Sequence, residues 1–266
     1  MTEPTVLYEE RGAVAIATLN RPQALNSFTR QMHRELGAAM GHVEANPALR
    51  AFVVTGAGRG FCAGADLSEF DFAPGPDLVE RANPGPVIDQ AFNPTVRRLQ
   101  ALRVPTIAAV NGVAAGAGAS LAMTCDIAIA APGASFIQAF SKIGLVPDAG
   151  GTWVLPRLVG TARAMGLAML GDKLSAEQAE SWGLIWKCID DDKLMAEAEK
   201  LSLHFSTAPT KGLAGTKQAL YASSENSLEQ QLELERALQQ KLGFGHDYRE
   251  GVAAFMEKRS PNFKGE

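Results

Sequence analysis

The chain has 266 residues, of which 46% are hydrophobic and 20% are charged. A chain of this length and composition can bury one large core, which excludes an intrinsically disordered protein. Its formal net charge of -4 offers no basic field for nucleic acid, so we expect no nucleic-acid partner.

The first part of the chain predicts a strand, a helix and a second strand. The N-terminal residues have neither the basic region nor the apolar region of a secretory signal, so we expect a cytoplasmic protein. Apolar residues alternate from Val6 to Leu19 on both sides of Gly12, which predicts a hairpin. Helical spacing predicts a helix from Thr29, as N-cap, to about Asn46, and residues 51–55 predict a buried strand.

The middle of the chain repeats this pattern after an irregular segment. Residues 72–86 are rich in proline and glycine, which predicts a mobile loop near the site, and a helix is expected over 87–102. Residues 106–110 predict a strand, Asn111-Gly112 a turn, 116–123 a helix and 126–130 a strand. Because the turn interrupts the longest apolar stretch, we expect no membrane span. Two such units indicate an α/β fold with sites at the strand ends.

The last part of the chain is almost entirely helix-forming. From residue 192 apolar residues recur at helical spacing, and they are more numerous than a terminal appendage needs for its own packing. We therefore divide the chain into a core, residues 1–191, and a helical oligomerisation region, residues 192–266, that packs on a neighbouring subunit.

Several common functional motifs are absent. The two glycine clusters do not match GxGxxG, no Gly-Lys-Ser/Thr follows them, and the segment around Ser120 lacks the second glycine of a nucleophile elbow. The four histidines are scattered, and the three cysteines form no CxxC pair, so we expect neither a metal site nor a disulfide framework.

Two glycine-rich segments remain as candidates for chemistry. They are RGFCAGADL, residues 59–67, and NGVAAGAGASLAM, residues 111–123, and each follows a predicted buried strand. Small side chains leave backbone N–H groups accessible, and two such groups can stabilise an oxygen that gains negative charge. The same glycines are equally compatible with tight turns where a helix packs on a sheet.

Three motifs in order, AGADL, NGVAAGAG and PDAGG, followed by a C-terminal FMEKR, resemble the crotonase (enoyl-CoA hydratase/isomerase) superfamily over residues 19–263. The resemblance implies a spiral of repeated ββα units with a C-terminal helical trimerisation region. It also implies an acyl-CoA thioester substrate, no metal or redox cofactor, and a homotrimer or homohexamer.

The resemblance further implies roles for individual residues. The two amides that bind the thioester oxygen fall on Ala65 and Ala117, where the family often has glycine at the second position, and Asp66 supports the first of these turns. Arg21 and the segment Ala63 to Leu67 are implied to lie near the nucleotide end of coenzyme A. Phe255 and Lys258 are implied to reach that end from a neighbouring subunit. Arg21 and Lys258 are equally compatible with ordinary solvated charges.

The positions that match the two water-activating glutamates of the hydratases are Ser120 and Phe140. Neither side chain can take a proton from water at neutral pH, which disfavours hydration by the usual route. Asp148 matches an aspartate of several isomerases and dehalogenases, and we interpret it as the acid/base. The alternative is that Asp148 caps the helix predicted after it.

We therefore expect an acyl-CoA isomerase that shifts a double bond, with Δ3-to-Δ2 enoyl-CoA isomerisation included. Stretches such as FSKIGLVPDAGGTWVLPR are similar to superfamily members that rearrange a ring-epoxide acyl-CoA. Two alternatives remain open. One is an enoyl-CoA hydratase with an unusual water-activating group, and the other is a non-catalytic RNA-binding homologue, which the acidic charge balance disfavours.

Overall fold

The computed structural model describes residues 3–266, and it contains two sheets. The larger sheet has the strand order β1-β2-β3-β5-β7-β10, in which β1 and β2 form the expected antiparallel hairpin and the other pairs are parallel. Its strands are β1 (Val6–Arg11), β2 (Val14–Leu19), β3 (Ala51–Gly56), β5 (Thr106–Val110), β7 (Ile127–Ala130) and β10 (Lys187–Cys188).

The smaller sheet has the order β4-β6-β8-β9 and consists of strands of only three residues. These are β4 (Gly60–Cys62), β6 (Val113–Ala115), β8 (Ser135–Ile137) and β9 (Lys173–Ser175). The chain passes repeatedly from a strand of the larger sheet to a strand of the smaller one and then to a helix, as in β5, β6 and α5 (Ala117–Thr124). This order is the ββα repeat that the family resemblance implied.

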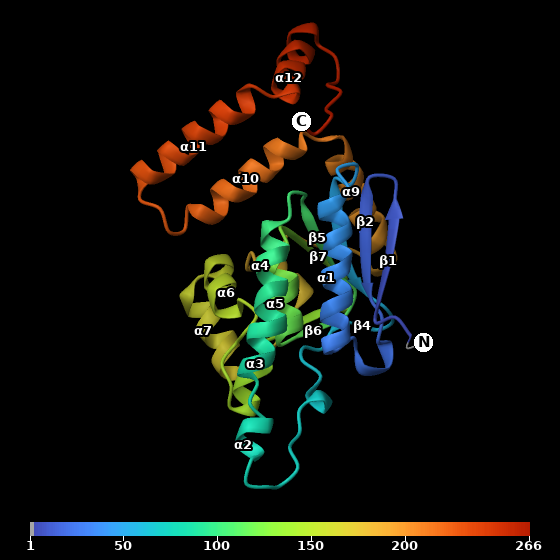
Figure 1. The fold of residues 1–266 in the computed structure, drawn as a ribbon, viewed down its shortest axis with the longest axis vertical. Coiled ribbons are helices and arrows are strands. Elements are labelled where there is room, and N and C mark those ends of the chain that lie inside the picture. The colour runs from blue at the N-terminus through green and yellow to red at the C-terminus, as the bar shows by residue number, and fades with distance from the viewer. Residues whose placement is uncertain (1–2) are drawn as a thin grey trace.

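Helices cover both faces of the larger sheet (Figure 1). On one face α1 (Arg30–Ala45) contacts α4 (Asn93–Ala101), and α4 contacts α5. On the other face α9 (Leu194–Thr207) contacts β2, β3, β5 and β7. As the sequence predicts, α1 begins after Thr29, whose side chain accepts a hydrogen bond from the Met32 amide. The remaining core helices are α6 (Gly151–Val159), α7 (Thr161–Leu170) and α8 (Ala176–Ser181).

Two sequence-based predictions need correction in the middle of the chain. Residues 113–115, for which the sequence predicts no element between the Asn111-Gly112 turn and the helix, form β6. The segment 72–86 is not wholly irregular, since it includes α2 (Leu78–Arg81) and enters α3 (Gly85–Val87). The helix expected over 87–102 is a π-helical turn, Ile88–Phe92, followed by α4.

The C-terminal helices divide into two groups. Helix α9 belongs to the core by its packing, since Leu194 and Ala198 are buried against the larger sheet. Helices α10 (Thr210–Ala222), α11 (Leu228–Gly243) and α12 (His246–Glu257) instead project from one end of the molecule, opposite α2 and α3 (Figure 1). The helical region expected from residue 192 thus begins with a helix that covers the core sheet. Within residues 3–266 no helix is long and apolar enough to span a bilayer.

Candidate active site

A cavity of about 200 Å³ lies where the two glycine-rich segments meet the loop before α6. It is lined by Ala63 to Ala65, by Gly116 and Ala117 at the start of α5, and by Phe140 and Asp148. Its other walls are apolar and come from the chain around α3 and from the loop before Asp148: Leu67, Phe70, Pro84, Val87, Ile88, Phe92, Ala139, Ile143 and Leu145. Among the described residues that line this cavity, Asp148 carries the one ionisable side chain.

The structure brings Ala65 and Ala117 to the same cavity. Gly64, with φ of +94°, lies so close to the second segment that a Cβ there would be 2.9 Å from the Ala115 carbonyl oxygen and 3.4 Å from the Ala117 nitrogen. Ala117 is the first residue of α5, whose early amides have no intrahelical acceptor. The amides of Ala65 and Ala117 donate no hydrogen bond to another group within residues 3–266. Both N–H groups are therefore available for a ligand oxygen.

Asp148 does not cap the helix that follows it, so that alternative interpretation is wrong. Helix α6 begins after Gly150, and no side chain accepts a hydrogen bond at its start. The Asp148 Oδ1 atom is buried and has no hydrogen-bond partner among the described residues. Burial raises the pKa of Asp148 to about 6, although its own backbone amide acts in the opposite direction. A carboxyl group with this pKa can both take and release a proton near neutral pH.

Of the two residues expected to match the hydratase glutamates, Phe140 lines the cavity and Ser120 does not. Ser120 is fully buried, and its hydroxyl lies 3.0 Å from the Asp148 carbonyl oxygen, outside the cavity lining. Phe140 lines the cavity and lies near Gly116, where a Cβ would be 3.6 Å from the Phe140 Cζ atom. The cavity wall that Phe140 forms is therefore apolar and carries no carboxylate.

The segment before α1 is fastened to the Ala65 turn. The Arg21 guanidinium lies 2.7 Å from the Asp66 carboxylate and also donates to the Ser27 carbonyl oxygen. Asp66 accepts hydrogen bonds from the Ser68 amide and hydroxyl, at the start of a 3₁₀ turn, as expected for a turn-forming carboxylate. Burial alone would raise the pKa of Asp66, but the bonds from Ser68 and Arg21 hold it below its ordinary value.

Phe255 and Lys258 do not lie at the cavity within one chain. Both are exposed, on or directly after α12, which projects at the end of the molecule opposite α2 and α3 (Figure 1). Phe255 instead lines a cavity of about 810 Å³ between α10, α11 and α12. By contrast, Ala63 and Leu67 line the smaller cavity, and Ala63 is fixed by the hydrogen bond from its amide to the Leu25 carbonyl oxygen.

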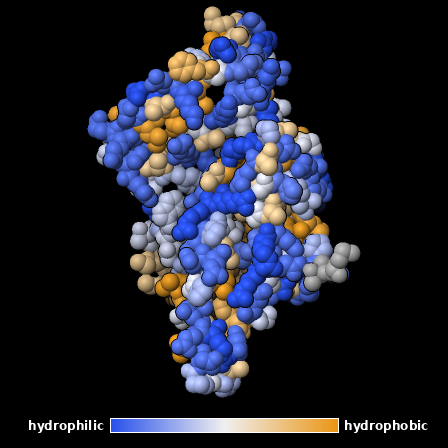
Figure 2. All heavy atoms as spheres, viewed as in Figure 1, coloured by the Kyte–Doolittle hydropathy of each residue, from blue (hydrophilic) through white to orange (hydrophobic). Residues whose placement is uncertain are grey.

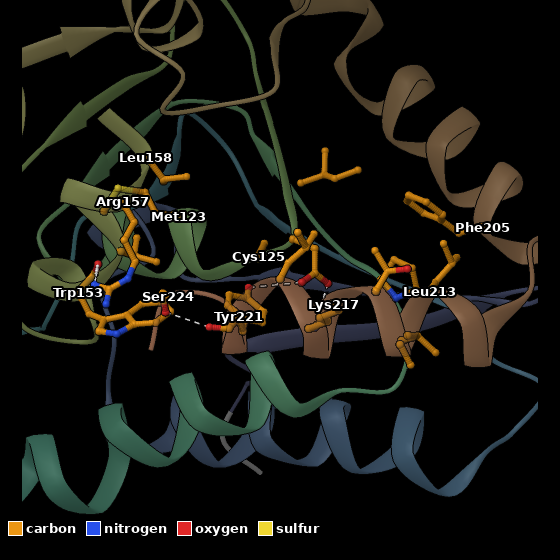
Figure 3. Close-up of a pocket in the computed structure, with 18 residues that line it drawn as sticks. Met123, Cys125, Trp153, Arg157, Leu158, Phe205, Leu213, Lys217, Tyr221 and Ser224 are labelled. Carbon is orange, nitrogen blue, oxygen red and sulfur yellow. Dashed lines mark hydrogen bonds and ion pairs between the residues drawn. The ribbon is translucent and has the colours of Figure 1, made fainter. Parts of the chain in front are cut away.

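A further cavity of about 440 Å³ lies between α10 and the core (Figure 3). Its charged groups are paired, since the Lys217 ammonium lies 2.9 Å from the Asp126 carboxylate, which also accepts from the Thr106 amide and hydroxyl. Arg157 stacks over the Trp153 ring at 4.1 Å. Neither of the two amides nor Asp148 reaches this cavity, so we favour the smaller one as the active site.

The apolar walls of the active-site cavity were not identified from the sequence. Phe70 comes from a segment without a predicted element, and Val87 and Phe92 come from a segment predicted only as a helix. Phe92 is packed from behind by Phe28 and by the buried His33, with ring centroids 5.6 Å and 4.3 Å away. Burial lowers the pKa of His33 to about 4, so this ring is neutral at pH 7. Only the burial of Phe92 in the folded chain identifies this wall, and the local periodicity of the sequence does not reveal that burial.

Comparison with known proteins agrees with this geometry. The family model of enoyl-CoA hydratase/isomerase matches residues 9–266. The chain belongs to the enoyl-CoA hydratase/isomerase family. It is 51% identical to the 1,2-epoxyphenylacetyl-CoA isomerase of Escherichia coli K12, with all of both chains covered. It is 33% identical to the trans-2-decenoyl-[acyl-carrier-protein] isomerase of Streptococcus mutans, with 98% of each chain covered.

Solved structures of the family have the same fold. The enoyl-CoA hydratase of Bacillus anthracis superposes with a TM-score of 0.90 at 30% identity, covering 98% of this chain and 100% of that one. The crotonase-like α/β fold expected from the sequence is confirmed, and the chain is an enzyme of the hydratase/isomerase family. Family membership does not by itself assign the reaction, because both hydratases and isomerases share this fold.

Proposed function

We propose that this chain is an acyl-CoA isomerase that binds the thioester oxygen of its substrate at the Ala65 and Ala117 amides and moves a proton through Asp148. The observation that carries the proposal is the Asp148 carboxyl group. It is the one ionisable side chain among the described cavity-lining residues, and its pKa is raised to about 6. A proton-transferring group is most effective when its pKa lies near the working pH.

The proposed reaction on a 3-enoyl-CoA needs one base. Asp148 removes a proton from C2, the negative charge spreads onto the thioester oxygen, and the same carboxyl group returns the proton to C4. Hydrogen bonds from Ala65 and Ala117 stabilise the dienolate more than the substrate, because its oxygen carries more charge. The product is the conjugated 2-enoyl-CoA, and neither a metal nor a redox cofactor takes part in these steps.

The acyl group is proposed to be unsaturated and to include a ring. The cavity walls contain Phe70, Phe92 and Phe140, whose flat faces suit a planar ring. The E. coli relative is named as an isomerase of an epoxidised phenylacetyl-CoA, which supports a ring-epoxide acyl-CoA as a substrate of this chain as well.

Coenzyme A binding is proposed to involve Arg21, Ala63, Asp66 and Leu67 of one chain and Phe255 and Lys258 of another. The first four lie at or beside the cavity. Arg21 is committed to Asp66, so its proposed role is to hold the Ala65 turn, with its remaining N–H groups free for a phosphate. Because α12 projects from its own chain, the two C-terminal residues can serve only a neighbouring site, in a homotrimer or homohexamer.

The experiment compares two substrates and one variant. Asp148→Asn keeps the shape of the side chain but removes the proton acceptor, so we expect isomerisation of a 3-enoyl-CoA to fall at least ~100-fold with little change in binding of a saturated acyl-CoA. The absorbance of the conjugated product measures the rate. Near-normal turnover of the Asn variant would remove Asp148 from the mechanism.

The second substrate separates isomerase from hydratase. Hydration of crotonyl-CoA needs a held water and a group that deprotonates it, and Phe140 makes that wall apolar. We expect the wild-type enzyme to hydrate crotonyl-CoA at least ~1000-fold more slowly than typical enzymatic rates, a deficit of about 4 kcal/mol in transition-state stabilisation. Rapid formation of 3-hydroxybutyryl-CoA would favour the hydratase alternative.

A further inference from the structure

The Ser120 hydroxyl joins two parts of the proposed active site. Ser120 lies one turn after Ala117 on α5 and is fully buried. Its Oγ atom is 3.0 Å from the Asp148 carbonyl oxygen and 3.4 Å from the Gly116 carbonyl oxygen. A hydroxyl has one hydrogen to donate, and the shorter contact is the better hydrogen bond. Ser120 therefore ties the helix that carries the Ala117 amide to the loop that carries Asp148.

Two hydrogen bonds to its carbonyl oxygen hold the backbone of Asp148 in place, and the bond from Ser120 is one of them. Within the described residues its Oδ1 atom has no hydrogen-bond partner. Its carbonyl oxygen accepts from two donors, the Ser120 hydroxyl and the Gly151 amide at 2.8 Å. The next residue, Ala149, has a φ of +48°, a conformation that costs a non-glycine residue free energy and persists only where the surroundings hold it.

The turn after Asp148 also leaves space for the Ser120 hydroxyl. A Cβ at Gly151 would lie 2.8 Å from the Ser120 Oγ atom, so a larger residue would push the loop away from α5. The sequence thus places the smallest residue opposite the hydroxyl. Proton transfer is sensitive to such spacing, because a misplacement of about 1 Å can lower a rate about 100-fold.

We propose that Ser120 is a positioning residue that fixes the distance between the Asp148 carboxyl group and the Ala117 amide, and that it acts on the reaction only through Asp148. The proposal rests on the isomerase function proposed above. The Ser120 side chain is not among the residues that line the cavity, so the role proposed for it is not contact with the substrate.

The first test is Ser120→Ala with a 3-enoyl-CoA as substrate. We expect kcat to fall ~10- to 100-fold, while KM and the Kd for butanoyl-CoA change less than ~2-fold, because the amides remain in place. Ser120→Cys keeps a weaker donor and should give an intermediate kcat. Unchanged kcat in folded Ser120→Ala enzyme would overturn the proposal.

The matched control is Ser202→Ala. Ser202 is also a fully buried helical serine whose hydroxyl donates to a carbonyl oxygen, that of Ala198 at 2.7 Å, but it lies on α9, away from the cavity. We expect Ser202→Ala, which also removes a buried serine hydroxyl from a helix, to keep the wild-type kcat. An equal loss of kcat in both variants would indicate general destabilisation and count against a positioning role.

A double-mutant cycle tests whether Ser120 acts through Asp148. In the Asp148→Asn background, Ser120→Ala should lower the residual rate no further, because the group that it positions no longer transfers a proton. Multiplied losses would overturn the proposal. If Asp148→Asn is inactive but Ser120→Ala keeps the wild-type kcat, only the role of Ser120 is wrong. Near-normal turnover of Asp148→Asn would instead contradict both the proposed function and the role of Ser120.

Discussion

A carboxylate that is poorly solvated and poorly hydrogen-bonded is costly to the folded state, and Asp148 is such a group, since its buried Oδ1 atom has no hydrogen-bond partner among the described residues. Its pKa is about 6 in the folded chain, against an ordinary value of 3.8. Between these pH values the folded chain holds more protons than the unfolded chain, so the contribution of Asp148 to stability falls as pH rises through this window. The neutral amide of Asp148→Asn avoids this cost.

We therefore predict that Asp148→Asn is more stable than the wild type by about 1–3 kcal/mol at pH 8 and nearly equal to it at pH 4. Urea unfolding at a fixed protein concentration measures the difference. His33 affects the pH dependence of stability in the opposite direction. Its pKa is lowered to about 4, so the free energy of unfolding decreases as pH falls from about 6.5 toward 4. This effect is common to both proteins and cancels. A difference independent of pH would mean that Asp148 titrates normally.

At the scale of elements, a largely buried ion pair is one of the contacts that attach α10 to the core. Lys217 on α10, labelled in Figure 3, bonds to the Asp126 carboxylate and to the Leu99 carbonyl oxygen. Both charged side chains of the pair are largely buried. Removing one partner leaves the other charge poorly solvated, whereas removing both is less costly. We therefore expect the pair to contribute to holding α10 against the core.

We predict that Lys217→Met lowers the free energy of unfolding by about 2–4 kcal/mol, and that adding Asp126→Asn restores part of the loss. The control is Lys200→Met, which removes an exposed pair with Glu197 and should cost less than about 1 kcal/mol. Equal effects of the two lysine changes would show that the Asp126 pair does not anchor α10.

At the scale of the whole molecule, the projecting helices leave an apolar surface uncovered. In the part of the chain that the structure describes, α11 buries none of its 16 residues. Leu220, Leu228 and Leu232 are each about half exposed or more, and Figure 2 shows hydrophobic groups over this end of the molecule. Such a surface is typical of a subunit interface.

We predict that the protein forms a multiple of three subunits in solution and that Leu232→Glu shifts it toward smaller species. Light scattering at micromolar concentration measures the mass. Ala237→Glu adds the same charge at an exposed position five residues further along α11, toward the opposite side of the helix, and should leave the mass unchanged. A monomeric wild-type protein would contradict the prediction and leave Phe255 and Lys258 without a site.

The sequence by itself determined the features that depend on local pattern and residue type. Alternation around Gly12 and the Thr29 cap predicted β1, β2 and α1, because hairpins and capped helices are specified by neighbouring residues. The absence of carboxylates at 120 and 140 and the presence of one at 148 were equally readable, since they are matters of residue identity.

Only the tertiary structure decided how these residues come together. The strands of the smaller sheet are three residues long, too short for a periodic pattern, and they form because β4, β6 and β8 pair across long stretches of chain. Other features also depend on long-range contacts. Gly64 approaches Ala117, the Asp148 side chain is partly buried and does not cap a helix, and α9 covers the sheet. Burial is a property of the packed chain, which a local sequence window cannot contain.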